Sequence, residues 1–110
     1  MRLIRSRSFD RRAERAGLDE DDLAELIRTL VERPDLGQVI PGTGGARKVR
    51  IRLPGRGKSG GARVIYAIVL RATALALLDV YAKGSQDNLT PQERKLIAKL
   101  LRTIELEFKP

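Results

Sequence analysis

The chain has 110 residues, with 22 basic and 14 acidic side chains, a formal net charge of +8, no cysteine and no histidine. This length fits a single domain, residues 1–110, with a core of its own. The absence of cysteine excludes disulfides and thiolate metal sites, and the absence of histidine removes the commonest metal ligand and the usual proton shuttle near neutral pH. Any acid–base chemistry must therefore use lysine, arginine, tyrosine or carboxylate side chains, and we expect no metal site and no cofactor.

The N-terminal third is predicted to form a helical hairpin. A short strand is expected at 3–4, and a first helix over 8–16 ends at Gly17. Asp19 is a good N-cap for a second helix, which Pro34 stops. The apolar stripe of this second helix consists of Leu23, Leu26, Ile27, Leu30 and Val31.

The middle of the chain is predicted to form three strands. Residues 37–45 are expected to be a loop because they contain several glycines and a proline. Over 48–53, apolar and basic residues alternate, which is typical of a half-buried strand with a cationic outer face. Segments 63–70 and 74–81 are apolar on both faces, as in central strands, and their close spacing favours an antiparallel meander.

A last helix is predicted to begin at Thr90, where Pro91 stands at the first helical position and Glu93 completes a capping box. The complete element order predicts an α+β fold: an N-terminal helical hairpin packed on a small, twisted antiparallel sheet, with a C-terminal helix. The predicted buried stripe of the last helix is Leu96, Ile97, Leu100, Leu101, Ile104 and Phe108.

The apolar segments are short. The N-terminal residues lack the apolar core of a signal peptide. The longest apolar run, 72–78, is too short to span a bilayer. We therefore expect a cytoplasmic protein without a membrane partner.

The net charge is concentrated in one segment. From Leu36 to Leu78 there is no aspartate or glutamate, and the basic side chains in this segment equal the net charge of the whole chain. Because ordinary protein surfaces mix both signs, the segment predicts a surface for a polyanion, most simply a nucleic acid. The basic residues are Arg47, Lys48, Arg50, Arg52, Arg56, Lys58, Arg63 and Arg71.

An antiparallel meander brings the polar residues of this segment to one edge of the sheet. Arginine supplies a planar fork for two phosphate oxygens, lysine supplies a mobile charge, and a tyrosine can stack on an unpaired base. Two simpler interpretations remain open: the alternating cations form a solvated strand face, and Tyr81 is a core residue. The converging residues are Arg50, Arg52, Arg63, Tyr81 and Lys83, with Arg56 and Lys58 in the neighbouring loop.

Two glycine-rich basic motifs and a downstream segment resemble the RelE/ParE toxin superfamily, most closely its HigB-like branch. The first motif is Pro41-Gly42-Thr43-Gly44-Gly45-Ala46-Arg47-Lys48. The second runs from Gly55-Arg56-Gly57-Lys58 to Ala62-Arg63-Val64-Ile65-Tyr66. The resemblance continues through Tyr81-Ala82-Lys83 and Asp87-Asn88-Leu89-Thr90-Pro91.

The resemblance implies the toxin of a type II toxin–antitoxin system that cuts translated mRNA in the ribosomal A site without a metal. It implies that Arg63 stabilises the pentavalent phosphate, that Lys83 faces the leaving oxygen, and that Tyr81 contacts the distorted nucleotide. Lys58, Lys48 or Arg50 would withdraw the 2′-proton, and Arg47, Arg52 and Arg56 would hold the RNA backbone. The implied partners are mRNA, the ribosome and a cognate antitoxin of the helix-turn-helix, HigA-like type.

Two other functions remain open. A ParE-like toxin shares this fold and inhibits gyrase, although that branch generally lacks the constellation of Arg63, Lys83 and Tyr81. A basic RNA- or ribosome-binding module without catalysis would lose affinity gradually with each removed charge. The last helix also lacks the histidine or tyrosine that some relatives place near the C-terminus. The identity of the general acid and base therefore stays open.

Overall fold

The computed structural model describes residues 1–53, 61–82 and 89–108. Within these ranges the chain forms three α-helices, five strands and one 3-10 turn. No helix in the described part of the chain is long and apolar enough to cross a membrane. The order is β1 (Arg2–Arg5), α1 (Arg7–Arg15), α2 (Glu20–Glu32), β2 (Gln38–Val39), β3 (Arg47–Ile51), β4 (Ala62–Val69), η1 (Leu70–Ala72), β5 (Ala74–Ala82) and α3 (Pro91–Glu107).

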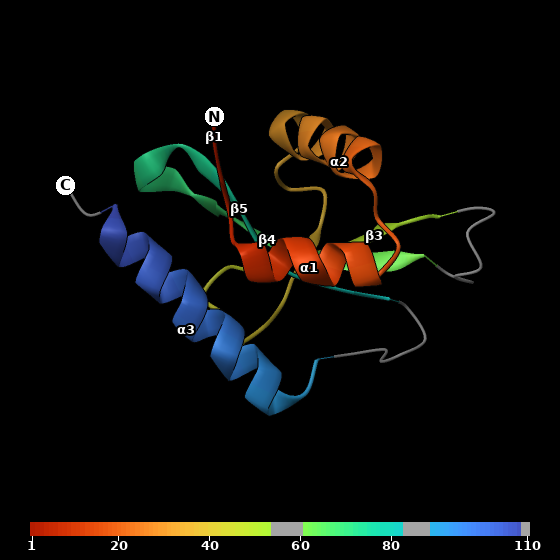
Figure 1. Cartoon of the computed structure of the whole chain (residues 1–110). Coiled ribbons are helices and arrows are strands. Elements are labelled where there is room, and N and C mark those ends of the chain that lie inside the picture. Colours follow the sequence, from red (N-terminus) through yellow and green to blue (C-terminus); the bar gives the residue numbers. More distant parts are fainter. Residues whose placement is uncertain (54–60, 83–88, 109–110) are drawn as a thin grey trace.

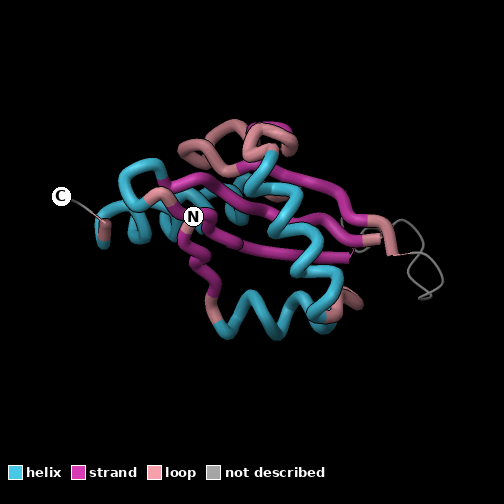
Figure 2. Tube along the Cα trace, turned by 90° about the horizontal axis from the view of Figure 1, so that it is seen from above, coloured by secondary structure: helices cyan, strands magenta, loops and turns pink. Residues whose placement is uncertain are grey.

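The strands form one sheet in the order β1-β5-β4-β3-β2, in which they run side by side (Figure 2). The antiparallel meander of β3, β4 and β5 is confirmed. The sheet as a whole is mixed rather than antiparallel, because β1 pairs with β5 in parallel. This pairing joins segments about seventy residues apart, which a local pattern does not reveal. The segment predicted as a loop also contains the short strand β2, which pairs with β3.

The two faces of the sheet have separate cores. Helices α1 and α2 cover one face, and α3 crosses the other (Figure 1). Along β4, Val64 and Tyr66 belong to the α1/α2 core, whereas Ile65 and Ala67 belong to the α3 core. The prediction that the strand over 63–70 is covered on both sides is confirmed.

The predicted helix starts are also confirmed. Asp19 caps α2, and its side chain forms a reciprocal capping box with Asp22. Thr90 and Glu93 form the same arrangement at α3, with Pro91 at the first helical position. In each box two backbone N–H groups at the N-terminus of the helix, which have no partner within the helix, donate to side-chain oxygens.

The predicted apolar stripes are wider than the observed buried ones. Leu96 is 62% exposed, Leu100 41% and Val31 42%. Helix α3 packs against β4 and β5, and its buried residues are Ile97 and Leu101. A helix with one neighbouring layer buries a narrower stripe than the apolar spacing of its sequence allows.

Tyr66 ties the sheet to the segment that leaves α2. Its hydroxyl is buried, donates to the carbonyl of Pro34 at 2.8 Å and accepts from the amide of Gly37 at 2.8 Å. A Cβ on Gly37 would lie 2.8 Å from a ring carbon of Tyr66, so the close approach requires glycine. Arg47 holds the same segment by donating to the carbonyls of Gly37 at 2.7 Å and Asp35 at 3.3 Å. Burial raises the pKa of the Tyr66 hydroxyl, which therefore stays protonated.

Replacing Tyr66 with phenylalanine is expected to lower the free energy of unfolding by about 1–3 kcal/mol, because it leaves the buried amide of Gly37 and the partly buried carbonyl of Pro34 without this partner. Urea denaturation measures the change. Thr103→Val is a suitable control, since it removes an exposed hydroxyl that bonds only within α3, and its effect should stay within about 0.5 kcal/mol. Equal effects of the two substitutions would contradict this role of Tyr66.

Candidate nucleic-acid interface

Arg50, Arg63 and Tyr81 lie side by side on three adjacent strands. The register of β3 and β4 pairs Arg50 with Arg63, and the register of β4 and β5 pairs Arg63 with Tyr81. Residues directly opposite in an antiparallel pair have Cβ atoms about 4.5–5.5 Å apart. The structure thus brings together three of the residues that the meander was predicted to gather, and we call these three the cationic row.

The cationic row faces the α3 side of the sheet. Its chain neighbours Val49, Val64 and Val80 all pack into the α1/α2 core, and successive side chains of a strand point to opposite faces. Tyr81 packs partly against the α3 core, so its ring lies at the margin of that core. The prediction of a cationic strand face and the alternative of a core tyrosine each describe part of this arrangement.

A close backbone contact fixes the register of the row. Gly61 has a φ of +73°, and a Cβ at this position would collide with the backbone of Ile51. Ala62, the next residue, pairs with Ile51, which sets Arg63 opposite Arg50. The backbone approach that only glycine permits at Gly61 therefore determines which cations stand opposite each other.

Arg63 carries a donor that the fold does not satisfy. Its side chain is half-buried, and its Nε has no hydrogen-bond partner within the ranges that the structure describes. Arg50 stands directly opposite, and like charges in that position destabilise a sheet. Both features favour binding of an anion, which would neutralise the charges and accept the hydrogen bond.

Three of the remaining predicted site residues lie within the described ranges, each in a different position. Lys48 lies on the same face, in the next row along β3, opposite Ile65. Arg47 is not brought to the row: it alternates onto the α2 face, and its guanidinium holds the segment at Gly37. Arg52 is exposed and follows the end of β3. Three residues lie outside the described ranges, namely Arg56, Lys58 and Lys83.

Asp79 is an acidic residue beside the cationic row that the sequence analysis did not single out. It pairs with Ile65, two positions along β4 from Arg63. One oxygen lies 3.1 Å from Nε of Arg12 and accepts the amide of Val80 at 2.8 Å. Burial raises the pKa of this carboxyl, against the opposing effects of the Val80 amide and Arg12. The acidic residues of the described ranges form no cluster able to hold a metal ion.

The raised pKa predicts how Asp79 affects stability. The folded protein binds this proton more tightly than the unfolded chain, so the contribution of Asp79 is fully present below its ordinary pKa of about 3.9 and is lost as pH rises through the raised value. Asp79→Asn should therefore gain stability relative to the wild type as pH rises above about 4. Urea denaturation across this pH range measures the difference. A relative loss with rising pH would mean that the ion pair with Arg12 outweighs the cost of burial.

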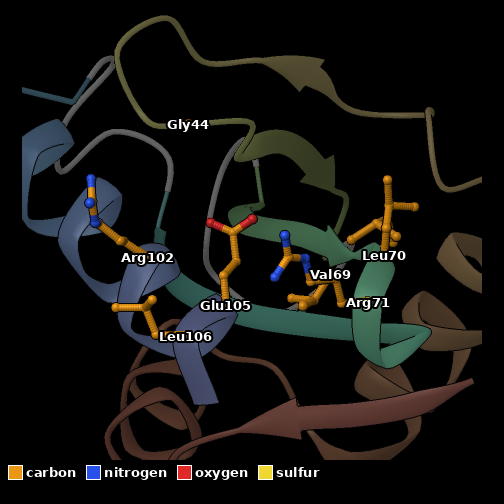
Figure 3. Close-up of a pocket in the computed structure, with 8 residues that line it drawn as sticks. Gly44, Val69, Leu70, Arg71, Arg102, Glu105 and Leu106 are labelled. Carbon is orange, nitrogen blue, oxygen red and sulfur yellow. The ribbon is translucent and has the colours of Figure 1, made fainter. Parts of the chain in front are cut away.

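Two cavities lie beside α3, one near its start at Arg94 and one near its end at Arg102 and Glu105. A cavity of about 430 Å³ next to β2 has Lys48 and Arg94 in its walls, and we call it the β2 cavity. A larger one of about 670 Å³ lies against η1 and is shown in Figure 3. In that view the Glu105 side chain lies between those of Arg71 and Arg102, so acidic and basic groups share its walls. The β2 cavity is the one lined by Lys48, which lies next to the cationic row on the same face of the sheet.

The fold and the cationic row together define a small α+β protein with one sheet face suited to polyanions. The chain belongs to the family described as the RelE toxin of the RelE/RelB toxin–antitoxin system, whose family model matches residues 1–107. Membership in this family implies an antitoxin as a partner.

Solved structures share the fold. The isolated E. coli RelE toxin, in a P21 crystal form, is 14% identical with a TM-score of 0.52, and the match covers 94% of this chain and 97% of that chain. A mutant E. coli RelE in the free state is 17% identical with a TM-score of 0.54, and that match covers 77% of this chain and 85% of the other. At these identities the likeness establishes the α+β fold alone.

Proposed function

We propose that this RelE-family toxin is a ribosome-dependent endoribonuclease that cuts translated mRNA in the A site. The observation that supports the proposal most directly is the register of the cationic row, which lines up Arg50, Arg63 and Tyr81 on one face. In the reaction the 2′-oxygen attacks the adjacent phosphorus, and the bond to the 5′-oxygen breaks. The products are a 2′,3′-cyclic phosphate and a 5′-hydroxyl, so no water or metal enters the balance.

Arg63 is the residue that we expect to stabilise the transition state. Negative charge accumulates on the phosphate oxygens as the pentavalent state forms, and a preorganised donor there contributes more than in water. The Nε of Arg63 is such a donor, since it is buried and without a partner among the described residues. Arg50 adds a second cation from the opposite strand, and the Tyr81 ring can stack on the displaced base.

The chain has no histidine, so the proton transfers must use lysine, arginine, tyrosine or carboxylate side chains. We propose that Lys58, Lys48 or Arg50 takes the 2′-proton and that Lys83 supports the leaving 5′-oxygen. A free lysine, with a pKa of about 10.4, is a poor base near neutral pH. Such a site gains most from a substrate that is already held in the reactive geometry. We therefore propose that the ribosome positions the mRNA and that Arg52 and Arg56 hold its backbone.

The antitoxin and the location follow from the same proposal. An exposed cationic face of this kind binds nucleic acid without discrimination unless it is covered. We propose that a helix-turn-helix antitoxin of the HigA-like type blocks this face, and that the free toxin acts on ribosomes in the cytoplasm.

Arg63→Ala is expected to reduce mRNA cleavage by about 10²–10³-fold, the usual effect of removing one donor to a developing oxyanion. The measurement is primer extension on a translated message after induced expression in bacteria. The same message without a start codon tests whether cleavage requires translation. Arg71→Ala is a matched control, since it removes the same charge from the far end of the β4–β5 hairpin.

Three results are informative. New cut ends in the translated message, present with wild type and Arg71→Ala but lost with Arg63→Ala, would support the proposal. Growth arrest without cut ends would replace it with inhibition of gyrase, as in the ParE-like alternative. If Arg63→Ala cuts as well as the wild type, the assignment of Arg63 is wrong.

A further inference from the structure

The β2 cavity has the composition of a nucleotide-binding site. Its volume of about 430 Å³ lies within the range of about 300–1,000 Å³ usual for ligand pockets. Among the described residues of its walls, the charged ones are both basic: Lys48 from β3 and Arg94 from α3. The apolar part of the wall includes Val39, Pro41 and Leu89.

The register of the sheet connects this cavity to the cationic row. Lys48 precedes Arg50 by two residues on the same face of β3, a separation of about 6.8 Å along the strand. This is comparable to the spacing of neighbouring phosphates in an extended single strand. Gln38 pairs directly with Lys48, so its amide stands on the same face, at the outer side of the cavity. An amide both donates and accepts hydrogen bonds, as the edge of a base requires.

Arg94 has donors that a phosphate can engage. Its Nε and Nη2 both point to the carbonyl of Leu89 at 3.4 Å, well beyond the usual length of 2.7–3.2 Å. These long contacts orient the guanidinium and cost little to replace. A phosphate oxygen accepts stronger, charge-assisted bonds from the same group.

We propose that the β2 cavity binds the nucleotide next to the scissile phosphate, with Lys48 and Arg94 on its phosphate and Gln38 on the edge of its base. The inference rests on the proposed function, which places the scissile phosphate at Arg63. It assigns Lys48 to the neighbouring phosphate, which leaves Lys58 and Arg50 as candidates for proton removal. The larger cavity at η1 is a poorer anion site, since Glu105 stands between its two arginines.

Short RNAs with a 2′-deoxy sugar at the cut site test the assignment without cleavage. The probes are a dinucleotide, which holds only the scissile phosphate, and two trinucleotides extended by one nucleotide at either end. Affinity is measured by NMR titration of the full chain at several salt concentrations. Arg94→Gln should weaken binding of one trinucleotide roughly tenfold. It should also reduce the salt slope, the steepness with which log K falls with log salt concentration, by about 0.7, the value for one phosphate contact of a single strand. It should leave the dinucleotide unchanged.

Two further variants separate this role from a structural one. Arg94→Lys keeps the charge and should restore most of the affinity and the salt slope. Arg102→Gln removes an arginine from the same helix, two turns further along, and should leave the affinities of all three probes within about twofold of the wild type, as expected for a distant exposed charge. On programmed ribosomes, Arg94→Gln should raise the half-saturating toxin concentration and leave the cleavage rate at saturation within a few-fold.

The outcomes separate this inference from the proposed function. If the wild type cuts mRNA on ribosomes and Arg94→Gln matches it in both binding and cleavage, the subsite is wrong and the proposed function stands. If the trinucleotide binds through Arg94 but the wild type never cuts, the subsite stands and the ribonuclease assignment fails. A protein that neither binds these RNAs nor cuts overturns both.

Discussion

The position of the cationic row depends on the burial of β4 on both faces. Val64 and Tyr66 face one core, and Ile65 and Ala67 face the other, so a shift of one residue would exchange two complete apolar sets. The strand thereby gives Arg63 a fixed side of the sheet. The Tyr66 hydroxyl adds a second restraint, because its two hydrogen bonds attach β4 to the segment that follows α2. The doubly buried strand thus orients Arg63, whose Nε has no hydrogen-bond partner among the described residues.

The basic side chains of the sheet have different structural roles, which the composition alone does not reveal. Arg47 and Lys48 are neighbours in the chain, but strand alternation sends the first to backbone carbonyls on the α2 side and the second to the β2 cavity. Asp79 is acidic and adjoins the row, yet Arg12 holds its carboxylate from α1. Some basic side chains are therefore used in contacts within the protein, as Arg47 and Arg12 are, whereas Lys48 lines a cavity that a ligand can enter.

Local signals predicted much of the fold, because they depend on residues close together in the chain. The capping boxes at Asp19 and Thr90 and the meander of β3 to β5 are confirmed for this reason. The parallel pairing of β1 with β5 and the exposure of Leu96 depend on distant neighbours and were not predicted. Of the candidate site, the antiparallel meander predicted that Arg50, Arg63 and Tyr81 meet. Arg94 was missed, because its place beside Lys48 results from the path of α3 across the sheet.

The parallel course of β1 has a practical consequence for handling the protein. Arg2 pairs with Ala74 at the start of β5, and its guanidinium lies 5.6 Å above the ring of Phe108 near the end of α3. Both described ends of the chain are thus close together, about 23 Å along β5 from Tyr81. A fluorophore, an affinity tag or a surface linker attached at either end leaves the opposite end of the sheet open to ligands.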